Sequence, residues 1–169
     1  AGTYLVKDIS PNDGSFDLGD LTVVGDQLFF RAYTSAGHEL WVSDGTSAGT
    51  IMVKDIWPGS GHGRPEEMVA VGDTLYFQAE TPGEGVELWK SDGTASGTVL
   101  LADINPGVDD SESDQFRREL TLIKNTLFFA ADDGTTGGEP WLIHLSSNTA
   151  PVASAGVPYN ITLGQSLTL

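Results

Sequence analysis

The sequence predicts an all-β fold built from three tandem units, and three observations support this prediction. One pattern of about 48 residues is written three times between residues 2 and 147. Each copy contains short runs rich in β-branched and aromatic residues, separated by turns that contain glycine. No run shows the periodicity of an amphipathic helix. We therefore expect three four-stranded antiparallel units in residues 1–147 and an extended arm in residues 148–169.

The repeat is visible in three segments of each unit. GTYLVKDI at residues 2–9 returns as GTIMVKDI and GTVLLADI, and LTVVGDQLFFRA at residues 21–32 returns as MVAVGDTLYFQA and LTLIKNTLFFAA. HELWVSDGT returns as VELWKSDGT and, in degraded form, within EPWLIHLSS. The tryptophans of this last segment are 48 and 52 residues apart, and the longer spacing comes from an acidic insertion at residues 108–114. Such a period indicates a repeat architecture.

Each unit reads as four short strands. Gly25 and Asp26 separate two apolar runs, which is the signal of a two-residue β-hairpin turn. A glycine-containing loop leads to the third strand, which carries the tryptophan. The fourth strand, residues 50–56 in the first full unit, follows the turn written DGTxxGT.

Both faces of these strands carry apolar side chains. Leu28 and Phe30 point to one face of their strand, and Phe29 points to the other. A sheet with one face in water would alternate more cleanly between apolar and polar residues. Four-stranded units of this period, apolar on both faces, are typical of β-propeller blades, and we predict that architecture.

The repeated motif also resembles a known family. Two copies of ELWxSDGTxxGT, each followed by VKDI or a variant of it, resemble the ELWxxDGT repeat family over residues 2–147. The resemblance implies a β-propeller on a secreted or surface protein, and it implies no enzymatic activity. The third copy departs from the pattern, because Pro140 replaces leucine and IHLSS replaces VSDGT.

The two ends of the repeat region have matching deficits. Residues 3–9 form a fourth strand with no unit before it, and the last unit lacks a fourth strand. We expect residues 3–9 to complete a last blade, either within a longer parent chain or in another copy of the chain. Three units are too few for a ring, because propellers have ~4–8 blades. The predicted partners are therefore other copies of this chain or the rest of a longer one. An open three-unit array would expose apolar end faces.

Residues 148–169 have a different character. NTAPVASAGVPYNITLGQSLTL resembles the opening strands of an Ig-like or polycystic-kidney-disease-type domain. The segment is too short for such a sandwich, which needs ~100 residues. It is either a truncated second domain or an extended arm that adds strands 152–155 and 161–169 to a neighbouring sheet.

Composition narrows the classes of partner. The chain has 24 acidic and 8 basic residues and a formal net charge of -16, which repels nucleic acid and anionic membrane surfaces. No apolar run reaches the length of a membrane helix, so we predict no membrane insertion. The absence of cysteine removes disulfides and thiol chemistry.

The most conspicuous carboxylates belong to the SDGT turns. A catalytic carboxylate needs a partner acid, base or nucleophile, and the motif supplies none. We expect each aspartate to accept a hydrogen bond from the N–H two residues on and the following glycine to adopt a positive φ. The tryptophans recur at one place in the repeat and are predicted to pack between units. The structural set is Trp41, Asp44, Gly45, Trp89, Asp92, Gly93 and Trp141.

Residues that break the repeat are better candidates for binding. Trp57 replaces a small polar residue in the connector after the fourth strand, and His62 and Arg64 follow it. These three residues are candidate contacts for a ligand or partner. We predict no catalytic residue and no cofactor other than a possible calcium ion, which takes six to eight oxygen ligands. The candidate ligands lie in two irregular acidic loops and are Asp109, Asp110, Asp114, Asp132 and Asp133.

These features favour a non-catalytic extracellular module, structural or adhesive, that mediates protein–protein assembly at a bacterial cell surface or in a secreted assembly. The alternative is a calcium- or carbohydrate-binding propeller domain. An enzyme with its catalytic groups at a central channel is a third possibility, for which the sequence offers no motif.

Overall fold

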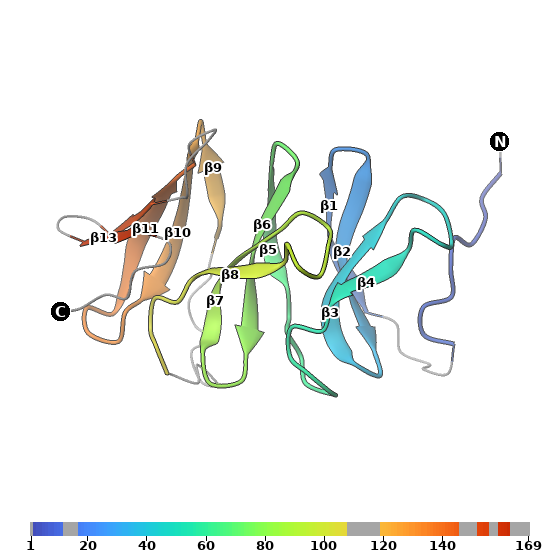
Figure 1. Cartoon of the computed structure of the whole chain (residues 1–169), viewed down its shortest axis with the longest axis horizontal. Helices are drawn as coiled ribbons and strands as arrows, with labels where there is room; N and C mark the ends of the chain where they lie inside the picture. The colour runs from blue at the N-terminus through green and yellow to red at the C-terminus, as the bar shows by residue number, and fades with distance from the viewer. Residues whose placement is uncertain (1, 12–16, 108–118, 146–151, 156–158, 163–169) are drawn as a thin grey trace.

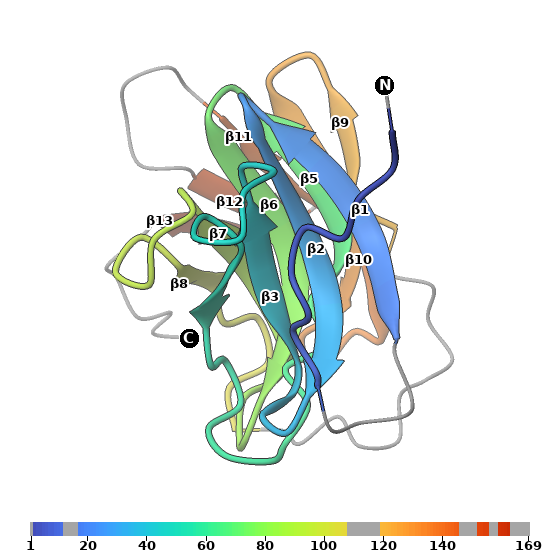
Figure 2. The ribbon, with the colours of Figure 1, turned by 90° about the vertical axis from the view of Figure 1, so that its right-hand side faces the viewer.

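The computed structural model describes residues 2–11, 17–107, 119–145, 152–155 and 159–162. Within these ranges the chain forms strands and no helix, which confirms the all-β prediction. The strands form three antiparallel sheets that follow one another along the long axis of the molecule (Figure 1). A view along that axis shows the sheets lying face over face (Figure 2). The described residues form an open stack and no closed ring.

The first two sheets have four strands each, in the order of the chain. In both, the third strand lies between the second and the fourth, and Phe30 opposite Trp41 recurs as Phe77 opposite Trp89. The first sheet consists of β1 (Leu18–Val24), β2 (Gln27–Thr34), β3 (Gly37–Ser43) and β4 (Ile51–Lys54). The second consists of β5 (Glu66–Val71), β6 (Thr74–Thr81), β7 (Gly85–Ser91) and β8 (Val99–Ala102).

The third sheet has three strands from the repeat and two from the tail. The repeat supplies β9 (Thr121–Ile123), β10 (Thr126–Asp132) and β11 (Gly138–His144). β12 (Val152–Ala155) pairs with the free edge of β11, and β13 (Tyr159–Thr162) pairs with β12. Both pairings add extended segments of the tail to this sheet. The interpretation of residues 148–169 as an arm or as a truncated second domain stays a prediction. β12 thus occupies the edge of β11, where a fourth strand such as residues 3–9 was predicted to complete the last blade.

The pairing of residues 3–9 with a last blade, in a longer parent chain or in another copy, stays a prediction. Among the described residues, residues 3–9 pair with no strand edge. Their contacts nevertheless repeat those of β4. Lys7 Nζ donates to the Thr50 carbonyl at 2.7 Å, and Lys54 Nζ donates to the Thr98 carbonyl at 2.8 Å. Residues 3–9 thus lie against the first sheet as β4 lies against the second.

The predicted hairpin turns are present at the start of each sheet. Gly25 and Gly72 each connect two paired strands with a φ of 58°. Lys124 holds the same left-handed conformation in the third sheet, with a φ of 57°. This conformation suits the right-handed twist of the flanking strands, and glycine adopts it at the lowest cost.

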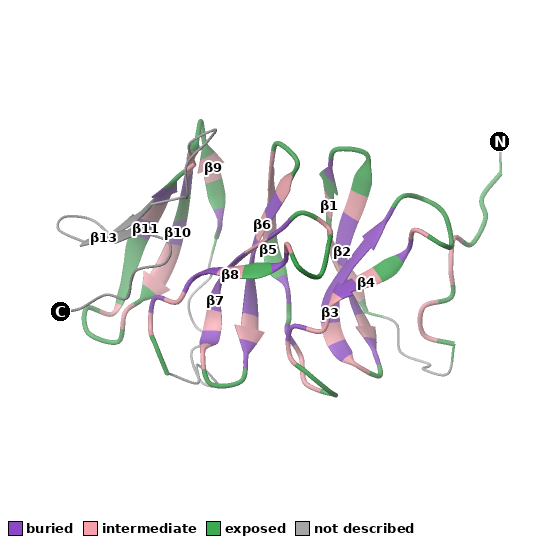
Figure 3. Cartoon of the chain, viewed as in Figure 1, coloured by how far each residue is buried: buried purple, intermediate pink, exposed green. Residues whose placement is uncertain are grey.

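Two apolar cores lie between the sheets. Figure 3 shows buried residues along strands of all three sheets. Phe29 and Leu40 of the first sheet meet Phe77 and Trp89 of the second. Leu88 on the opposite face of the second sheet belongs to the next core. That core continues into the third sheet through Leu127, Phe129, Trp141 and Ile143. The second sheet is therefore covered on both faces, as a sheet with two apolar faces requires.

A third, smaller cluster lies on the outer face of the first sheet. Phe30, Ala32 and Trp41 are buried there, and Ile9 packs against them. These residues correspond in the repeat to Phe77, Ala79 and Trp89, which face the first sheet. The outer face of the first sheet is therefore built like a surface that receives another sheet.

Truncating one phenylalanine in a core and one on an end face tests this packing. We expect Phe77→Ala to lower the free energy of unfolding by about 3–5 kcal/mol, because the fully buried ring leaves a cavity. Phe128→Ala, on the more exposed face of β10, is expected to cost less than half as much. Denaturant unfolding at low protein concentration measures both, and equal losses would contradict the assignment of the cores.

Candidate functional site

The SDGT turn is held together by its aspartate. Asp44 Oδ1 accepts the Thr46 N–H at 2.8 Å and the Thr46 hydroxyl at 2.7 Å. Gly45 between them has a φ of 85°. Asp92 and Thr94 make the same two bonds in the second unit, at 2.9 and 2.7 Å. These are the bonds and the glycine conformation that sequence analysis expected of a turn. They hold the pKa of both aspartates below its ordinary value.

The remaining hydroxyls of the motif are bonded to one another. Ser43 Oγ and Thr50 Oγ1 are 2.7 Å apart and buried, and Thr50 Oγ1 donates to the Thr46 carbonyl. The second unit repeats both distances with Ser91 and Thr98. The polar residues of the SDGTxxGT motif thus form a hydrogen-bond network among themselves, and this network directs the chain into β4 and β8.

The second glycine of the motif is required by a close contact. A Cβ on Gly49 would lie 2.1 Å from Asp44 Oδ1, and a Cβ on Gly97 would lie 2.0 Å from Asp92 Oδ1. Because real atoms do not approach so closely, the aspartate of the turn and the glycine five residues later depend on each other.

Two buried glutamates hold the connectors that leave the fourth strands. Glu39 is fully buried and accepts the backbone N–H groups of Ile56 at 2.7 Å, Gly63 at 3.0 Å and Trp57 at 3.3 Å. Glu87 accepts the N–H of Ile104 at 2.9 Å in the second unit. Each glutamate lies two residues before the tryptophan of its strand, at equivalent places in the repeat.

Burial raises the pKa of Glu39 to about 7, although the three N–H donors act in the opposite direction. The nearby Asp55 carboxylate adds a smaller upward contribution to this pKa. A carboxyl that titrates near neutrality is often a functional-site candidate. Here its oxygens are bound to backbone donors of the connector, which assigns Glu39 a positioning role.

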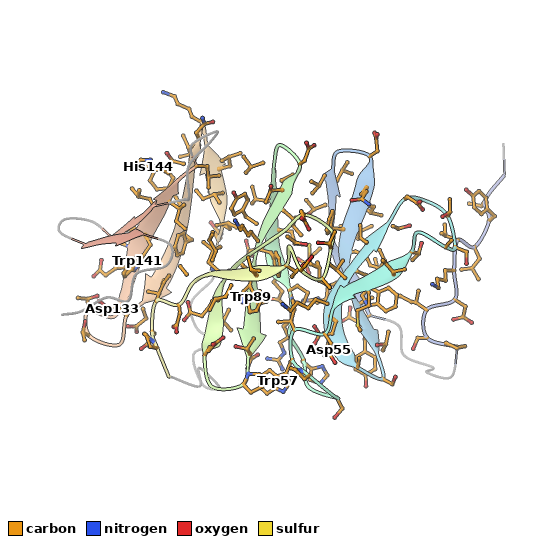
Figure 4. All side chains as sticks on the ribbon, viewed as in Figure 1. Asp55, Trp57, Trp89, Asp133, Trp141 and His144 are labelled. Carbon is orange, nitrogen blue, oxygen red and sulfur yellow. The ribbon has the colours of Figure 1, made fainter. Side chains whose placement is uncertain are left out.

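The connector between β4 and β5 carries the three predicted contact residues. The Trp57 ring lies directly over Gly61, where an added Cβ would be 1.8 Å from Trp57 Cδ1. Arg64 N–H donates to the His38 carbonyl at 3.0 Å, and its guanidinium is 3.7 Å from Glu80 Oε2. In Figure 4 Trp57 lies at the edge of the stack, where the first two sheets meet. The connector therefore bridges these sheets.

An aromatic cluster forms where this connector meets the β2–β3 turn. The rings of Tyr33, His38 and His62 have centroids 5.0 to 5.9 Å apart. The backbone N–H of His38 donates to His62 Nδ1 at 3.3 Å. Burial, followed by the Arg31 charge, lowers the pKa of His38. The sequence did not predict that Tyr33 and His38 join this cluster, because they lie more than twenty residues before His62 in the chain.

Arg31 joins the first two sheets through carboxylates. Its guanidinium pairs with Glu66 of β5, lies 3.4 Å from Asp20 and is 4.0 Å from Asp17. Gln78 and Ala130 occupy the equivalent places in the other units, so this ion cluster belongs to the first unit alone. Its position beside His38 extends the non-repeating surface around Trp57, His62 and Arg64.

The calcium candidates are divided between two loops. Asp109, Asp110 and Asp114 lie outside the described residues. Asp133 Oδ1 accepts four hydrogen bonds from Thr135 and Thr136, which lower its pKa, and Asp132 Oδ1 accepts the Gly134 N–H. Within the ranges given above, no three acidic or histidine side chains gather as a metal site. Figure 4 shows His144 and Asp133 at opposite ends of the third sheet. Calcium binding stays a prediction.

Comparison with protein-family models and with curated proteins gave no match. The resemblance to the ELWxxDGT repeat family therefore rests on the repeated motif of this chain. Among the residues that the structure covers, no helix is long and apolar enough to cross a membrane.

Replacing Gly49 tests the dependence of the turn on this glycine. We expect Gly49→Ala to lower the free energy of unfolding by about 1–3 kcal/mol, because the new methyl group displaces the Asp44 carboxylate. Gly2→Ala is the matched control, since Gly2 begins the same repeat segment and has no atom within 4 Å of its Cβ position. Thermal and urea unfolding measure both variants, and an equal effect would contradict the close contact.

The pKa of Glu39 predicts a specific pH dependence of stability. The folded-state pKa of about 7 exceeds the ordinary value of 4.5, so the folded chain binds more protons than the unfolded chain between these values. Stability is therefore expected to fall as the pH rises through this window. The Glu39 contribution is up to about 3 kcal/mol, at about 1.4 kcal/mol for each pKa unit.

Glu39→Gln removes this contribution, so the variant should lose less stability than the wild type between about pH 5 and about pH 8 in urea unfolding. Glu139→Gln changes the equivalent but exposed position and should retain the wild-type dependence. A Glu39→Gln curve parallel to the wild-type curve would refute the assignment.

Proposed function

We propose that this chain is a non-catalytic structural and adhesion module, of the β-propeller repeat type, that assembles with protein partners outside the cell. The observation that carries the proposal is the use made of the recurrent carboxylates. Asp44, Asp92, Glu39 and Glu87 each accept hydrogen bonds from backbone groups of a turn or connector. Their repetition serves the geometry of the sheets, and this supports a scaffold rather than an active site.

Propeller-type packing is supported by how the sheets approach each other. β1 and β5 are the pair of strands from different sheets with the most extensive approach. Thr22 Oγ1 of β1 donates to the Met68 carbonyl of β5 at 3.4 Å. In a propeller the blades are arranged about a central axis, and a close approach of neighbouring first strands is consistent with that arrangement. Two copies of the chain would supply six sheets, within the ~4–8 of known propellers.

The surface proposed for partner contact is the non-repeating region of the first connector. It combines Trp57, His62 and Arg64 with Tyr33 and His38. Aromatic rings and arginine are enriched in protein interfaces, where they supply contact area and directed hydrogen bonds. Because this surface is absent from the repeat pattern, it is where one module of this type would differ from another.

Carbohydrate binding is the second candidate, because the Trp57 ring lies on a connector at the edge of the stack (Figure 4). An indole face is suited to stacking on a sugar ring. Calcium binding by the acidic loops belongs to the same alternative, and Asp132 and Asp133 are its described candidates.

A glycan array and a calcium titration separate the two candidates. The adhesion proposal predicts no signal on the array and neither calorimetric heat nor a melting shift with calcium. A glycan signal that Trp57→Ala removes and Trp89→Phe retains would overturn it in favour of a carbohydrate-binding role. Calcium heat that Asp133→Asn removes would overturn it in favour of a calcium-dependent one. Labelling of intact producing cells, followed by protein cross-linking, tests the extracellular location and the protein partner directly.

A further inference from the structure

Four large apolar side chains are exposed on the two end faces of the stack. Leu21 and Val23 lie on β1 and are 59% and 65% exposed. Ile123 and Phe128 lie in the third sheet and are 53% and 37% exposed. We call Leu21 and Val23 the N-face and Ile123 and Phe128 the C-face. Their positions in the repeat indicate what each face is built to contact.

The N-face residues have buried counterparts in the other two units. Leu21 and Val23 correspond to Met68 and Ala70, which pack against the core shared with the first sheet. They also correspond to Leu120 and Leu122, which pack into the core shared with the second sheet. In both cases the residues face the preceding sheet. The N-face is therefore one half of an interface between sheets.

The C-face residues are the opposite half. Ile123 and Phe128 correspond to Val24 and Phe29, which are buried against the second sheet. They also correspond to Val71 and Tyr76, which pack against the third sheet. These residues face the following sheet. One chain thus carries both halves of an interface that it already forms twice internally.

We propose that the N-face of one copy of this chain docks onto the C-face of a second copy, continuing the internal stacking. This inference rests on the proposed assembly function and names the partner and the surface. Such a contact joins two different patches, so it forms a closed ring or an open series, according to the rotation between copies. A second copy is favoured as the occupant because the two exposed faces bear the same residue pattern that pairs inside the chain.

Residues 2–9 and β12 make the proposal more specific. Residues 2–9 already lie on the first sheet as the fourth strand of a preceding sheet, through Lys7 and Ile9. Their natural neighbour in a docked copy is the edge of β11, which β12 occupies in the single chain. Docking therefore exchanges the β12 pairing for pairing with residues 3–9 of the neighbour. The exchange replaces one short ladder by another, so the buried apolar faces provide the net driving force.

The net charge of -16 opposes association at low ionic strength, and added salt screens this repulsion. We therefore expect the affinity between copies to rise with salt concentration, because the contact buries apolar surface. A contact held by ion pairs would instead weaken as salt is added.

Two single variants and their mixture test the contact. Val23→Glu blocks the N-face, and Phe128→Glu blocks the C-face. Ile51→Glu adds the same charge at an exposed site whose counterparts Tyr4 and Val99 are also exposed, away from the sheet interfaces. The masses of all variants are measured by light scattering and sedimentation in high salt, and circular dichroism checks that each is folded.

We expect the wild type and Ile51→Glu to associate, and each face variant to weaken association by at least about tenfold, because docking would bury an unpaired carboxylate. An equimolar mixture of the two face variants should form a 1:1 dimer, since each supplies the face that the other lacks. Hydrogen exchange should show β12 protected in the monomeric variants and exposed in the assembled wild type.

Several results would overturn the proposal. One is a wild type that remains monomeric at roughly 1 mM, where even a weak specific contact is populated. Another is association of Phe128→Glu alone, which would mean that N-faces pair with themselves. Continued protection of β12 in the assembled form would exclude the strand exchange. Glycan or calcium binding would contradict the proposed function and leave these masses unchanged, so the two failures are distinguishable.

Discussion

A sheet that carries apolar side chains on both faces is stable in water only when both faces are covered, and this constraint organises the whole chain. The second sheet satisfies it with Phe77 against the first sheet and Leu88 in the core shared with the third. On the outer face of the first sheet Ile9 packs over Trp41 and covers part of the face, while Leu21 and Val23 remain exposed. Stacking is thus the means by which any unit of this sequence becomes stable, as in other repeat proteins.

The polar residues of the repeat contribute to this packing, because their hydrogen bonds fix how each sheet is placed against the next. The Asp44 turn directs the chain into β4, and Lys54 of β4 donates to the Thr98 carbonyl and lies 5.6 Å from the centre of the Trp89 ring. Glu39 then holds the connector that leads to β5. Each bond links one unit to its own next strand or to the following unit. The hydrogen bonds from three backbone donors offset part of the cost of burying the Glu39 carboxylate, and the raised pKa shows that burial outweighs them.

The repeat made the strands, the hairpin turns and the Asp-Gly-Thr geometry predictable, because these depend on residues close in the chain and recur in register. Contacts between distant segments were not predictable. The approach of His38 to His62 and the burial of Glu39 depend on how a connector folds back over a turn. The pairing of β12 with β11 was not predictable, because the sequence of an extended segment does not specify which sheet edge it joins. Residues 3–9 pair with no strand of the described residues, because a strand forms only where a second edge lies beside it.

The degraded motif in the third unit follows from the same logic. In the first two units the hydrogen-bonded turn is needed because the next segment must return as a fourth strand at the sheet edge. After β11 that edge is taken by β12, whose sequence has no relation to VKDI. Glu139 is exposed, whereas Glu39 and Glu87 are buried beneath the connectors they bind. Pro140, at the place of Leu40 and Leu88, is exposed on a face that no further sheet of the described residues covers. The motif residues missing from the third unit are therefore those whose hydrogen bonds and contacts this unit does not form. Trp141 is retained because it still packs into the core between the second and third sheets.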